Sequence, residues 1–345
     1  MPYSAWTTLR CFERMPTPPE PPTSPRRGKP GEWDAGAAVR TKPRRRLSEA
    51  GGEDFYFAPG LVPVARHPLV VALGPPAIRR VLVEHLQTHL VFTERLEHDC
   101  VNATLQRIAR GRVGVEMSPQ MRLDAYRLYC DEAYHALFSA DLALQVETAT
   151  GIGPRGGEPP AFLRHLRRVR AAQPPALRRL ADMLFAVVSE TLISGTLRES
   201  WRDGRVVPAV REVLGDHAED EEHHHLYFTA FFELLWPRLT PAERAAVGPL
   251  LPGFIRGFLS PDRPAIEAAL VRCGVRPADT AQVLAESYPE EIVLADMREA
   301  SRVTRRLFAR TGVLDEPATA DAFAAAGLLE RGAGESRRED ARETR

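Results

Sequence analysis

The chain has 345 residues, of which 44% are hydrophobic, so it can bury a sizeable core in one large domain or two small ones. Lysine plus arginine and aspartate plus glutamate are balanced at 46 each, which gives no electrostatic case for nucleic acid or a membrane surface as partner. No apolar run approaches the roughly 18 residues of a transmembrane helix.

The two ends of the chain differ from its middle in composition. Residues 1–55 combine proline, glycine and charge with little to bury, so we expect a mostly disordered tail. For its basic cluster Arg44–Arg46 we favour a solvated state over the alternative, contact with an acidic partner. This tail has no apolar segment typical of a secretory signal, and the four cysteines lack CxxC spacing. A reducing, cytoplasmic location is therefore predicted. We expect one helical domain over residues 56–313, then a C-terminal helix and a charged disordered tail over 314–345.

Helical patterns dominate the middle of the chain, and the sequence predicts an all-α fold. Ser118 and Pro119 form a helix start, and Gly151 ends that helix. Thr240 and Glu243 have the spacing of a capping box. The predicted helices span 76–110 with a bend near Thr88 and His89, 119–150, 162–170, 175–201, 208–236, a helix from 241, 263–274 and 278–311. A short extended segment is expected at 62–71.

Glutamate and histidine recur at helical spacing in two of these helices. Glu132 and His135 are three residues apart, and so are Glu221 and His224. Residues three or four apart share one face of a helix, so each pair presents a carboxylate and an imidazole together. One such pair occurs by chance in many helices, but two on separate helices are typical of a dinuclear carboxylate site in a four-helix bundle.

That type of site needs one further glutamate from each of two other helices. Glu190 lies in the apolar stretch ADMLFAVVSETLISG, where an ionised carboxylate without a partner would be costly. The alternative for Glu190 is a narrow polar stripe with its neighbours Ser189 and Thr191. For the other helix both Glu94 and Glu97 qualify, and we favour Glu97 because its face continues into apolar positions.

His217 lies one turn before Glu221 and shares its face, but a standard carboxylate bundle needs only two histidines. From spacing alone, His217 is equally well a third nitrogen ligand or an exposed histidine in a charged stretch. Asp220 or Asp131 is a candidate to orient a ligand histidine through its second ring nitrogen. The remaining acidic and histidine residues of the segment 216–225 are expected to face water.

Several competing enzyme classes lack their motifs. The sequence contains no HExxH zinc-protease motif, no P-loop and no GxSxG elbow. Its one GxGxxG match, residues 151–156, follows a helix where a dinucleotide site requires a strand, so we interpret it as a linker. With no flavin or nicotinamide motif, an oxidase of this kind needs an external electron donor.

In the segments that carry these glutamates and histidines, the chain resembles the p-aminobenzoate N-oxygenase family, the diiron enzymes that oxidise aryl amines to nitro compounds. The resemblance runs from about Phe55 to Phe308. It is carried, in order, by FAPGLVPVARHPLV, ERLEHDCVNATLQRIARG, LDAYRLYCDEAYHALFSADLALQV, SETLISGTL and DHAEDEEHHHLYFTAFFELLW. The long N-terminal tail departs from the compact family core, and no function is carried over to it.

The resemblance implies a ferritin-like four-helix bundle core with additional flanking helices, and a site for two iron ions. The family's four glutamates and three histidines would correspond to Glu97, Glu132, His135, Glu190, His217, Glu221 and His224. His217 is then the extra histidine that distinguishes the family.

The implied reaction is O2-dependent N-oxygenation of a small-molecule amine, to the hydroxylamine, nitroso or nitro level, in the biosynthesis of a secondary metabolite. The resemblance also implies a possible homodimer. Manganese suits the same ligands as iron. Two alternatives remain open: another diiron oxidation, by a C–H hydroxylase, desaturase or ferroxidase, and a metal-free helical scaffold.

Overall fold

The structure, a computed structural model, describes residues 33–48, 54–154 and 158–329. Within these ranges the chain is helical, and its one β-bridge is an isolated pair between Phe55 and Val206. The predicted all-α class is therefore confirmed. The proposed division of the chain at residues 55 and 313 stays a prediction; a helix does lie beyond the second boundary, α16 (Pro317–Ala325).

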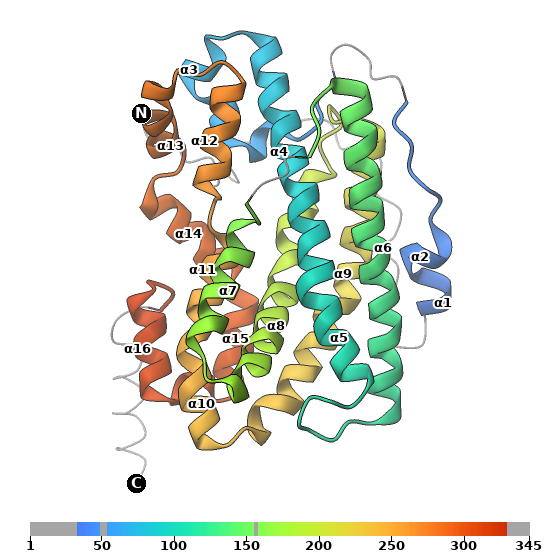
Figure 1. The fold of residues 1–345 in the computed structure, drawn as a ribbon, viewed down its shortest axis with the longest axis vertical. Helices are drawn as coiled ribbons and strands as arrows, with labels where there is room; N and C mark the ends of the chain where they lie inside the picture. The colour runs from blue at the N-terminus through green and yellow to red at the C-terminus, as the bar shows by residue number, and fades with distance from the viewer. Residues whose placement is uncertain (1–32, 49–53, 155–157, 330–345) are drawn as a thin grey trace, which may run out of the picture.

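Two long helical hairpins form the centre of the molecule (Figure 1). In the first hairpin, one continuous rod packs against the helix that follows it, α6 (Pro119–Thr150). That rod consists of α4 (Pro75–Leu96), the π-helical turn η3 (Glu97–Val101) and α5 (Asn102–Ala109). The second hairpin pairs α8 (Pro175–Ser200) with α9 (Pro208–Leu235). Contacts of α6 with α9 and of η3 with α8 join the hairpins into a four-helix bundle.

Local capping chemistry explains where the bundle helices begin and end. The Ser118 hydroxyl accepts a hydrogen bond from the amide of Met121, and Pro119 occupies the first helical position, where no amide hydrogen is needed. Gly151 ends α6 at φ 70°, a left-handed conformation that glycine adopts without steric cost. Pro208 begins α9, and Pro237 follows its end.

Shorter helices pack on the outside of the bundle, most of them along α8, with α12 against α4 (Figure 1). The predicted capping box at Thr240 and Glu243 is present. These flanking helices are α7 (Ala161–Ala172), α10 (Pro241–Val247), α11 (Leu251–Leu259), α12 (Arg263–Arg272), α13 (Pro277–Ser287), α14 (Glu290–Ala300), α15 (Arg302–Arg310) and α16.

Three predictions about these elements are wrong. The single helix expected at 278–311 is divided into α13, α14 and α15, because Pro289 forces Tyr288 out of the helical region to φ −132°, ψ 63°, and a further break falls at Ser301. The irregularity in the first rod is η3, and α4 runs unbroken through Thr88 and His89. The segment expected to be extended at 62–71 forms the helical turns η2 (Pro63–Arg66) and α3 (Pro68–Val71), each opened by a proline.

The N-terminal region also differs from the prediction. Residues 33–48, which we call the N-terminal strap, contain the short helices α1 (Trp33–Gly36) and α2 (Ala38–Thr41) and lie along α6 and α9 (Figure 1). The predicted disorder of residues 1–55 is wrong for this stretch, and residues 1–32 and 49–53 lie outside the described ranges. Arg44 and Arg45 are not simply solvated, because they pair with Asp141 of α6 and Asp216 of α9 at 2.6–3.0 Å.

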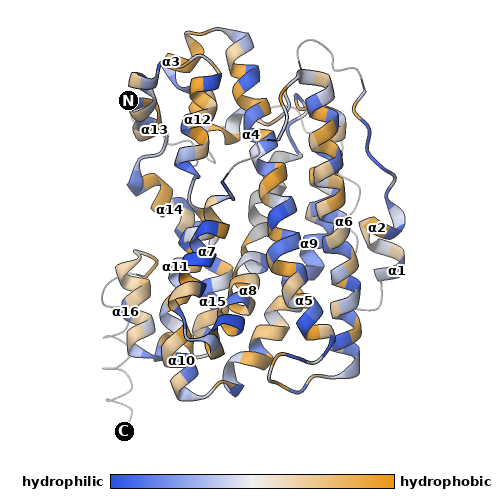
Figure 2. Cartoon of the chain, viewed as in Figure 1, coloured by the Kyte–Doolittle hydropathy of each residue, from blue (hydrophilic) through white to orange (hydrophobic). Residues whose placement is uncertain are grey.

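Side chains of the bundle interior are mainly aromatic and aliphatic, with Phe185, Phe228, Phe231, Phe232 and Trp236 completely buried. Hydrophilic residues nevertheless recur along α4, α6 and α9 (Figure 2). Among the described residues, no helix combines the length and the hydropathy needed to cross a membrane.

Candidate metal centre

The four rods of the bundle each direct polar side chains into the same buried space. These side chains are Glu97 from η3, Glu132 and His135 from α6, Glu190 from α8, and His217, Glu221 and His224 from α9. All seven are at most 1% exposed. The structure therefore brings together every residue of the predicted ligand set.

Helical spacing explains how two rods supply five of the seven groups. On α6, Glu132 and His135 lie one turn apart and face inward together, because positions three residues apart share a face. On α9, the spacing of four and then three residues aligns His217, Glu221 and His224 in the same way. Their exposed neighbours in the charged run, Glu222 and His223 among them, point away from the bundle.

The seven residues form three overlapping groups that could each hold a metal ion. Within a group, every residue offers a nitrogen or oxygen atom within 4.8 Å of the others. The groups are Glu97, His135, His217 and Glu221; Glu132, His135, Glu221 and His224; and Glu97, Glu132 and Glu190. Because four of the residues belong to two groups each, the arrangement suits two adjacent ions that share carboxylates.

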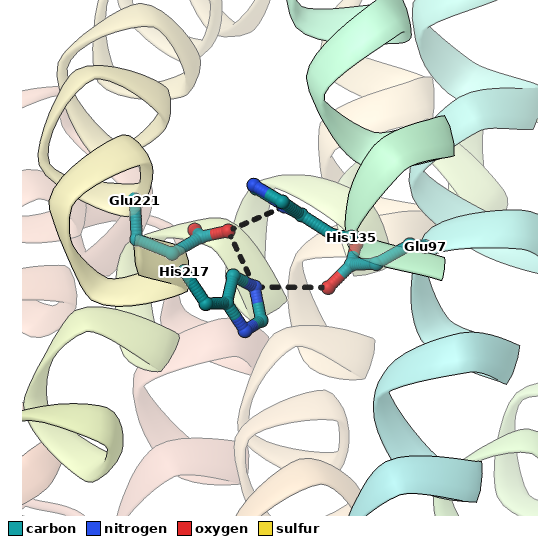
Figure 3. Close-up of side chains that lie close together, drawn as sticks. All are labelled: Glu97, His135, His217 and Glu221. Atoms are coloured by element: carbon teal, nitrogen blue, oxygen red, sulfur yellow. Dashed lines mark hydrogen bonds and ion pairs between the residues drawn. The ribbon is translucent and has the colours of Figure 1, made fainter. Parts of the chain in front are cut away.

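The first group is shown in Figure 3. Its centre is Oε1 of Glu221, which lies 3.0 Å from Nε2 of His217 and 3.6 Å from Nδ1 of His135. Nε2 of His217 also lies 3.7 Å from Oε1 of Glu97. Helices η3, α6 and α9 thus converge here with two carboxylates and two imidazoles.

The second group is centred on Glu132 of α6. Its two carboxylate oxygens lie 2.9 Å from Nδ1 of His135 and 2.7 Å from Nδ1 of His224. Nδ1 of His224 also lies 3.9 Å from Oε2 of Glu190 and 3.4 Å from Oε1 of Glu221. Glu190 and Glu97 are therefore both within side-chain reach of the histidines.

Several oxygen atoms of this cluster have no hydrogen-bond donor. Among the described residues, neither carboxylate oxygen of Glu97 or of Glu190 accepts a hydrogen bond, although both side chains are fully buried. An unpaired buried carboxylate is costly, because burial removes its hydration without replacement. The donor set is thus incomplete without a cation, and oxygen and imidazole nitrogen are the donors that first-row divalent metals accept.

Burial and mutual repulsion divide the four carboxylates into two kinds. Burial, followed by the charge of neighbouring glutamates, raises the pKa of Glu97 and of Glu190 well above the usual value. Burial acts the same way on Glu132 and Glu221, but the adjacent imidazoles outweigh it. They hold the pKa of Glu132 below its usual range and lower the pKa of Glu221 to about 2.

The three imidazoles divide in a similar way. Burial opposes protonation of all three, but hydrogen bonds and nearby carboxylates raise the pKa of His135 to about 10 and that of His224 well above its usual value. Burial and the neighbouring His135 lower the pKa of His217. In the metal-free cluster the imidazolium groups of His135 and His224 therefore balance the carboxylates of Glu132 and Glu221, while the environment of Glu97 and Glu190 favours their protonated form.

The structure also distinguishes between the alternatives that spacing left open. Glu97, and not Glu94, belongs to the cluster. His217 is 1% exposed, so the exposed alternative for this histidine is wrong. The hydroxyls of Ser189 and Thr191 bond to carbonyl groups of their own helix, so they form no polar stripe that would satisfy Glu190.

Two aspartates lie behind the histidines, on the side away from the cluster. Oδ2 of Asp220 is 3.0 Å from Nε2 of His135, and Oδ2 of Asp131 is 3.3 Å from Nε2 of His224. In His135 and His224 the ring nitrogen that faces away from the cluster therefore has a carboxylate partner, which fixes the ring orientation. The sequence had offered these aspartates only as alternative candidates, and the structure uses both.

A cavity of about 280 Å³ lies between the N-terminal strap and the bundle. Arg44, Tyr134, Phe138 and Val213 are among the residues that line it. The Phe138 ring also packs against His135 and His217, at centroid distances of 5.3 and 5.7 Å. Phe138 thus stands between this cavity and the imidazoles of the cluster.

Comparison with known proteins agrees with this geometry. Residues 33–312 match the family described as p-aminobenzoate N-oxygenase AurF. A 4-aminobenzoate N-oxygenase of Streptomyces thioluteus is 28% identical over 255 residues, which cover 71% of this chain and 70% of that protein. The match begins at the first residue of the strap and includes all seven clustered residues. The predicted kind of protein, an oxidoreductase with a buried site suited to two metal ions, is confirmed. The chain belongs to the p-aminobenzoate N-oxygenase family.

Proposed function

We propose that this protein is a non-haem diiron oxygenase that uses O2 and external electrons to N-oxygenate an amine, with an aryl amine as substrate class. The observation that carries the proposal is the buried cluster of four carboxylates and three imidazoles drawn from four rods. Family membership and the relative's activity on 4-aminobenzoate support the choice of an amine nitrogen as the reacting atom.

The charge of the donor set favours two divalent cations. Four ionised glutamates carry four negative charges, the three imidazoles are neutral as ligands, and two divalent ions balance the set. The ligands proposed are Glu97, Glu132, His135, Glu190, His217, Glu221 and His224. Manganese has similar preferences, so the assignment to iron depends on the family and on redox chemistry.

The chain's own residues have three tasks in this reaction. The carboxylates and imidazoles bind the ions, Asp131 and Asp220 orient two of the imidazoles, and the apolar interior excludes water from the centre. When bound and reduced, the two irons supply the O2 activation that no side chain can perform. The electrons come from a separate donor protein or reductant.

Product analysis tests the proposed reaction. The Fe(II)-loaded protein, given O2, a chemical reductant and 4-aminobenzoate or a related aryl amine, is expected to yield hydroxylamine, nitroso or nitro products. Oxygen inserted at carbon, a desaturated product, or iron oxidation alone would each contradict N-oxygenation and indicate another diiron oxidation. Absence of bound transition metal after anaerobic Fe(II) loading would contradict the metal site itself.

Metal loading is expected to release protons. At pH 7 the metal-free cluster retains protons on His135, whose pKa is raised to about 10, and on His224, whose pKa is raised well above its usual value, and the raised pKa values of Glu97 and Glu190 favour protons there as well. Two ions that take all four residues as ligands therefore displace at least the two imidazolium protons, about two per chain or more. Anaerobic titration of lightly buffered protein with Fe(II) and a pH indicator measures this number. Release of fewer than about two protons would show that the ions bind elsewhere.

A further inference from the structure

The N-terminal strap contacts both aspartates that stand behind the metal-centre histidines. The indole Nε1 of Trp33 donates to Oδ1 and Oδ2 of Asp131 at 2.9 and 2.8 Å. The backbone amide of Ala38 donates to Oδ1 and Oδ2 of Asp220 at 3.1 and 3.3 Å. Asp131 and Asp220 are 2% and 4% exposed; the bonds from Ala38 are buried, and those from the half-buried Trp33 are partly buried.

In both contacts a single carboxylate oxygen connects the strap to a histidine. Oδ2 of Asp131 accepts from Trp33 and lies 3.3 Å from Nε2 of His224. Oδ2 of Asp220 accepts from the Ala38 amide and lies 3.0 Å from Nε2 of His135. Two parts of one sixteen-residue segment therefore contact two different rods of the bundle, α6 and α9. On each rod the contact is with an aspartate that is paired with a histidine of the cluster.

The orientation of each ring follows from this contact. With Nε2 held by an aspartate, His135 and His224 both present Nδ1 to the cluster, 2.9 and 2.7 Å from the oxygens of Glu132. Metal bound at Nδ1 requires the ring proton on Nε2, which then donates to the aspartate. A donor on the far side of that aspartate limits the rotation of its carboxylate, and thereby of the ring.

The strap is held in place by charge complementarity as well as by these two bonds. Its basic residues meet acidic side chains on the outer faces of α6 and α9. The pairs are Lys42 with Glu219, Arg44 with Asp141, and Arg45 with Asp216, at 2.6–3.0 Å. The strap thus crosses both rods that carry the oriented histidines, and its register is fixed on each side (Figure 1).

We propose that the N-terminal strap is a positioning element of the metal centre, in which Trp33 and the Ala38 amide hold Asp131 and Asp220, and these hold His224 and His135 as ligands. The inference depends on the proposed function, because it assigns the strap a role in retaining the two ions. Neither residue touches the ions or the substrate. Loss of either donor is expected to loosen one ligand histidine.

The Ala38 contact can be tested by removing its hydrogen-bond donor. Ala38→Pro eliminates the amide hydrogen at the first position of α2, where proline is tolerated, and Ala37 already has the φ −58°, ψ 137° that precedes a proline. Ala38→Gly retains the amide and is the matched control. We expect Ala38→Pro to release Fe(II) to a chelator about tenfold faster than wild type, and Ala38→Gly to change the rate less than twofold, in line with the roughly 10–100-fold cost of losing an outer partner of a ligand.

The Trp33 contact provides an independent variant. Trp33→Phe removes the indole donor, whereas Arg40→Ala removes the cation packed on that ring at 5.5 Å and its exposed ion pair with Asp34 but keeps the donor, and it serves as the control. Trp33→Phe is expected to accelerate Fe(II) release about tenfold. The Mössbauer parameters of one iron site should shift in each donor variant. General destabilisation of the strap, which the control variants report, would not produce this shift.

Epistasis decides whether the donors act through the aspartates. In an Asp220→Asn background, Ala38→Pro is expected to add less than a twofold change, and the same holds for Trp33→Phe in Asp131→Asn. If the wild type binds two irons and the donor variants match it in release rate and spectrum, the strap inference is overturned but the proposed function is not. Additive effects in the double variants would also overturn the strap inference. Wild-type chain that binds no iron would instead overturn the proposed function.

Discussion

Glu221→Ala is expected to abolish N-oxygenation and to leave the protein with less than one iron per chain. Glu221 belongs to both histidine-containing groups, and its Oε1 lies 3.0–3.6 Å from ring nitrogens of His217, His135 and His224. Loss of an outer partner of a ligand costs about 10–100-fold, so loss of a carboxylate shared by two ions should cost more than about 100-fold in activity. Iron analysis after anaerobic loading and turnover of an aryl amine measure the two effects.

The adjacent residue is a matched control for this variant. Glu222 has the same side chain on the same helix but is exposed, so Glu222→Ala is expected to keep two irons and activity within about twofold of wild type. His223→Ala against His224→Ala repeats the comparison for imidazole, because His223 is exposed and His224 is fully buried. Full iron content in Glu221→Ala would rule out the proposed ligand set.

The sequence predicted the members of the cluster because helical spacing is a local property. The pairs Glu132 with His135 and Glu221 with His224 align on one face whatever surrounds them. Glu190 was identifiable because an acidic residue in an apolar helix needs a partner. Spacing could not decide the role of His217, since the spacing is the same for a buried and an exposed face, and only the resemblance to the family did so.

The strap was missed because its order depends on partners far away in the sequence. Its composition is that of a disordered tail, and the residues that hold it, Asp131 and Asp220, lie 98 and 182 positions further along the chain. Composition reports what a segment can bury by itself, and this segment is fixed by hydrogen bonds and ion pairs to the bundle. The one available signal was complementarity between its arginines and the acidic residues around 216–220.

The π-helical turn at Glu97–Val101 was also not predictable. A single turn is too short for the spacing of its hydrophobic residues to distinguish α-helical from π-helical geometry. Turns of this kind occur frequently at functional sites, since they displace a side chain from the regular helical register. Here the turn begins at Glu97. Spacing alone did not distinguish this glutamate from Glu94, and the choice depended on the apolar face that Glu97 shares.

The metal-free protein is expected to lose stability as the pH rises from 7 to 9. The folded state retains a proton on His135, whose pKa is raised to about 10, and the raised pKa values of His224, Glu97 and Glu190 act in the same direction, whereas in the unfolded chain these groups have their ordinary, lower pKa values. Raised pKa values contribute stability that is present below the unfolded value and is lost as the pH climbs toward the folded value. Each retained proton corresponds to about 1.4 kcal/mol per pH unit.

His217 acts in the opposite direction but outside this window. Its pKa is lowered, so it costs stability only where the unfolded chain protonates it, below about pH 6.5. Denaturant unfolding of chelator-treated protein at pH 7, 8 and 9 should therefore show a fall of at least about 1.4 kcal/mol per pH unit, the value for one proton.

Loading with two Fe(II) ions should make the unfolding free energy nearly independent of pH between 7 and 9, because the ions displace the protons from both histidines and both glutamates. Glu190→Gln supplies the internal check. The glutamine mimics the protonated carboxyl and has no proton to release. The unfolding free energy of the metal-free variant should therefore fall less steeply with pH than that of wild type, and at pH 9 it should be the larger of the two. A metal-free wild type whose stability is constant or rises over this range would mean that the cluster does not hold these protons, and that its carboxylates are neutralised in another way.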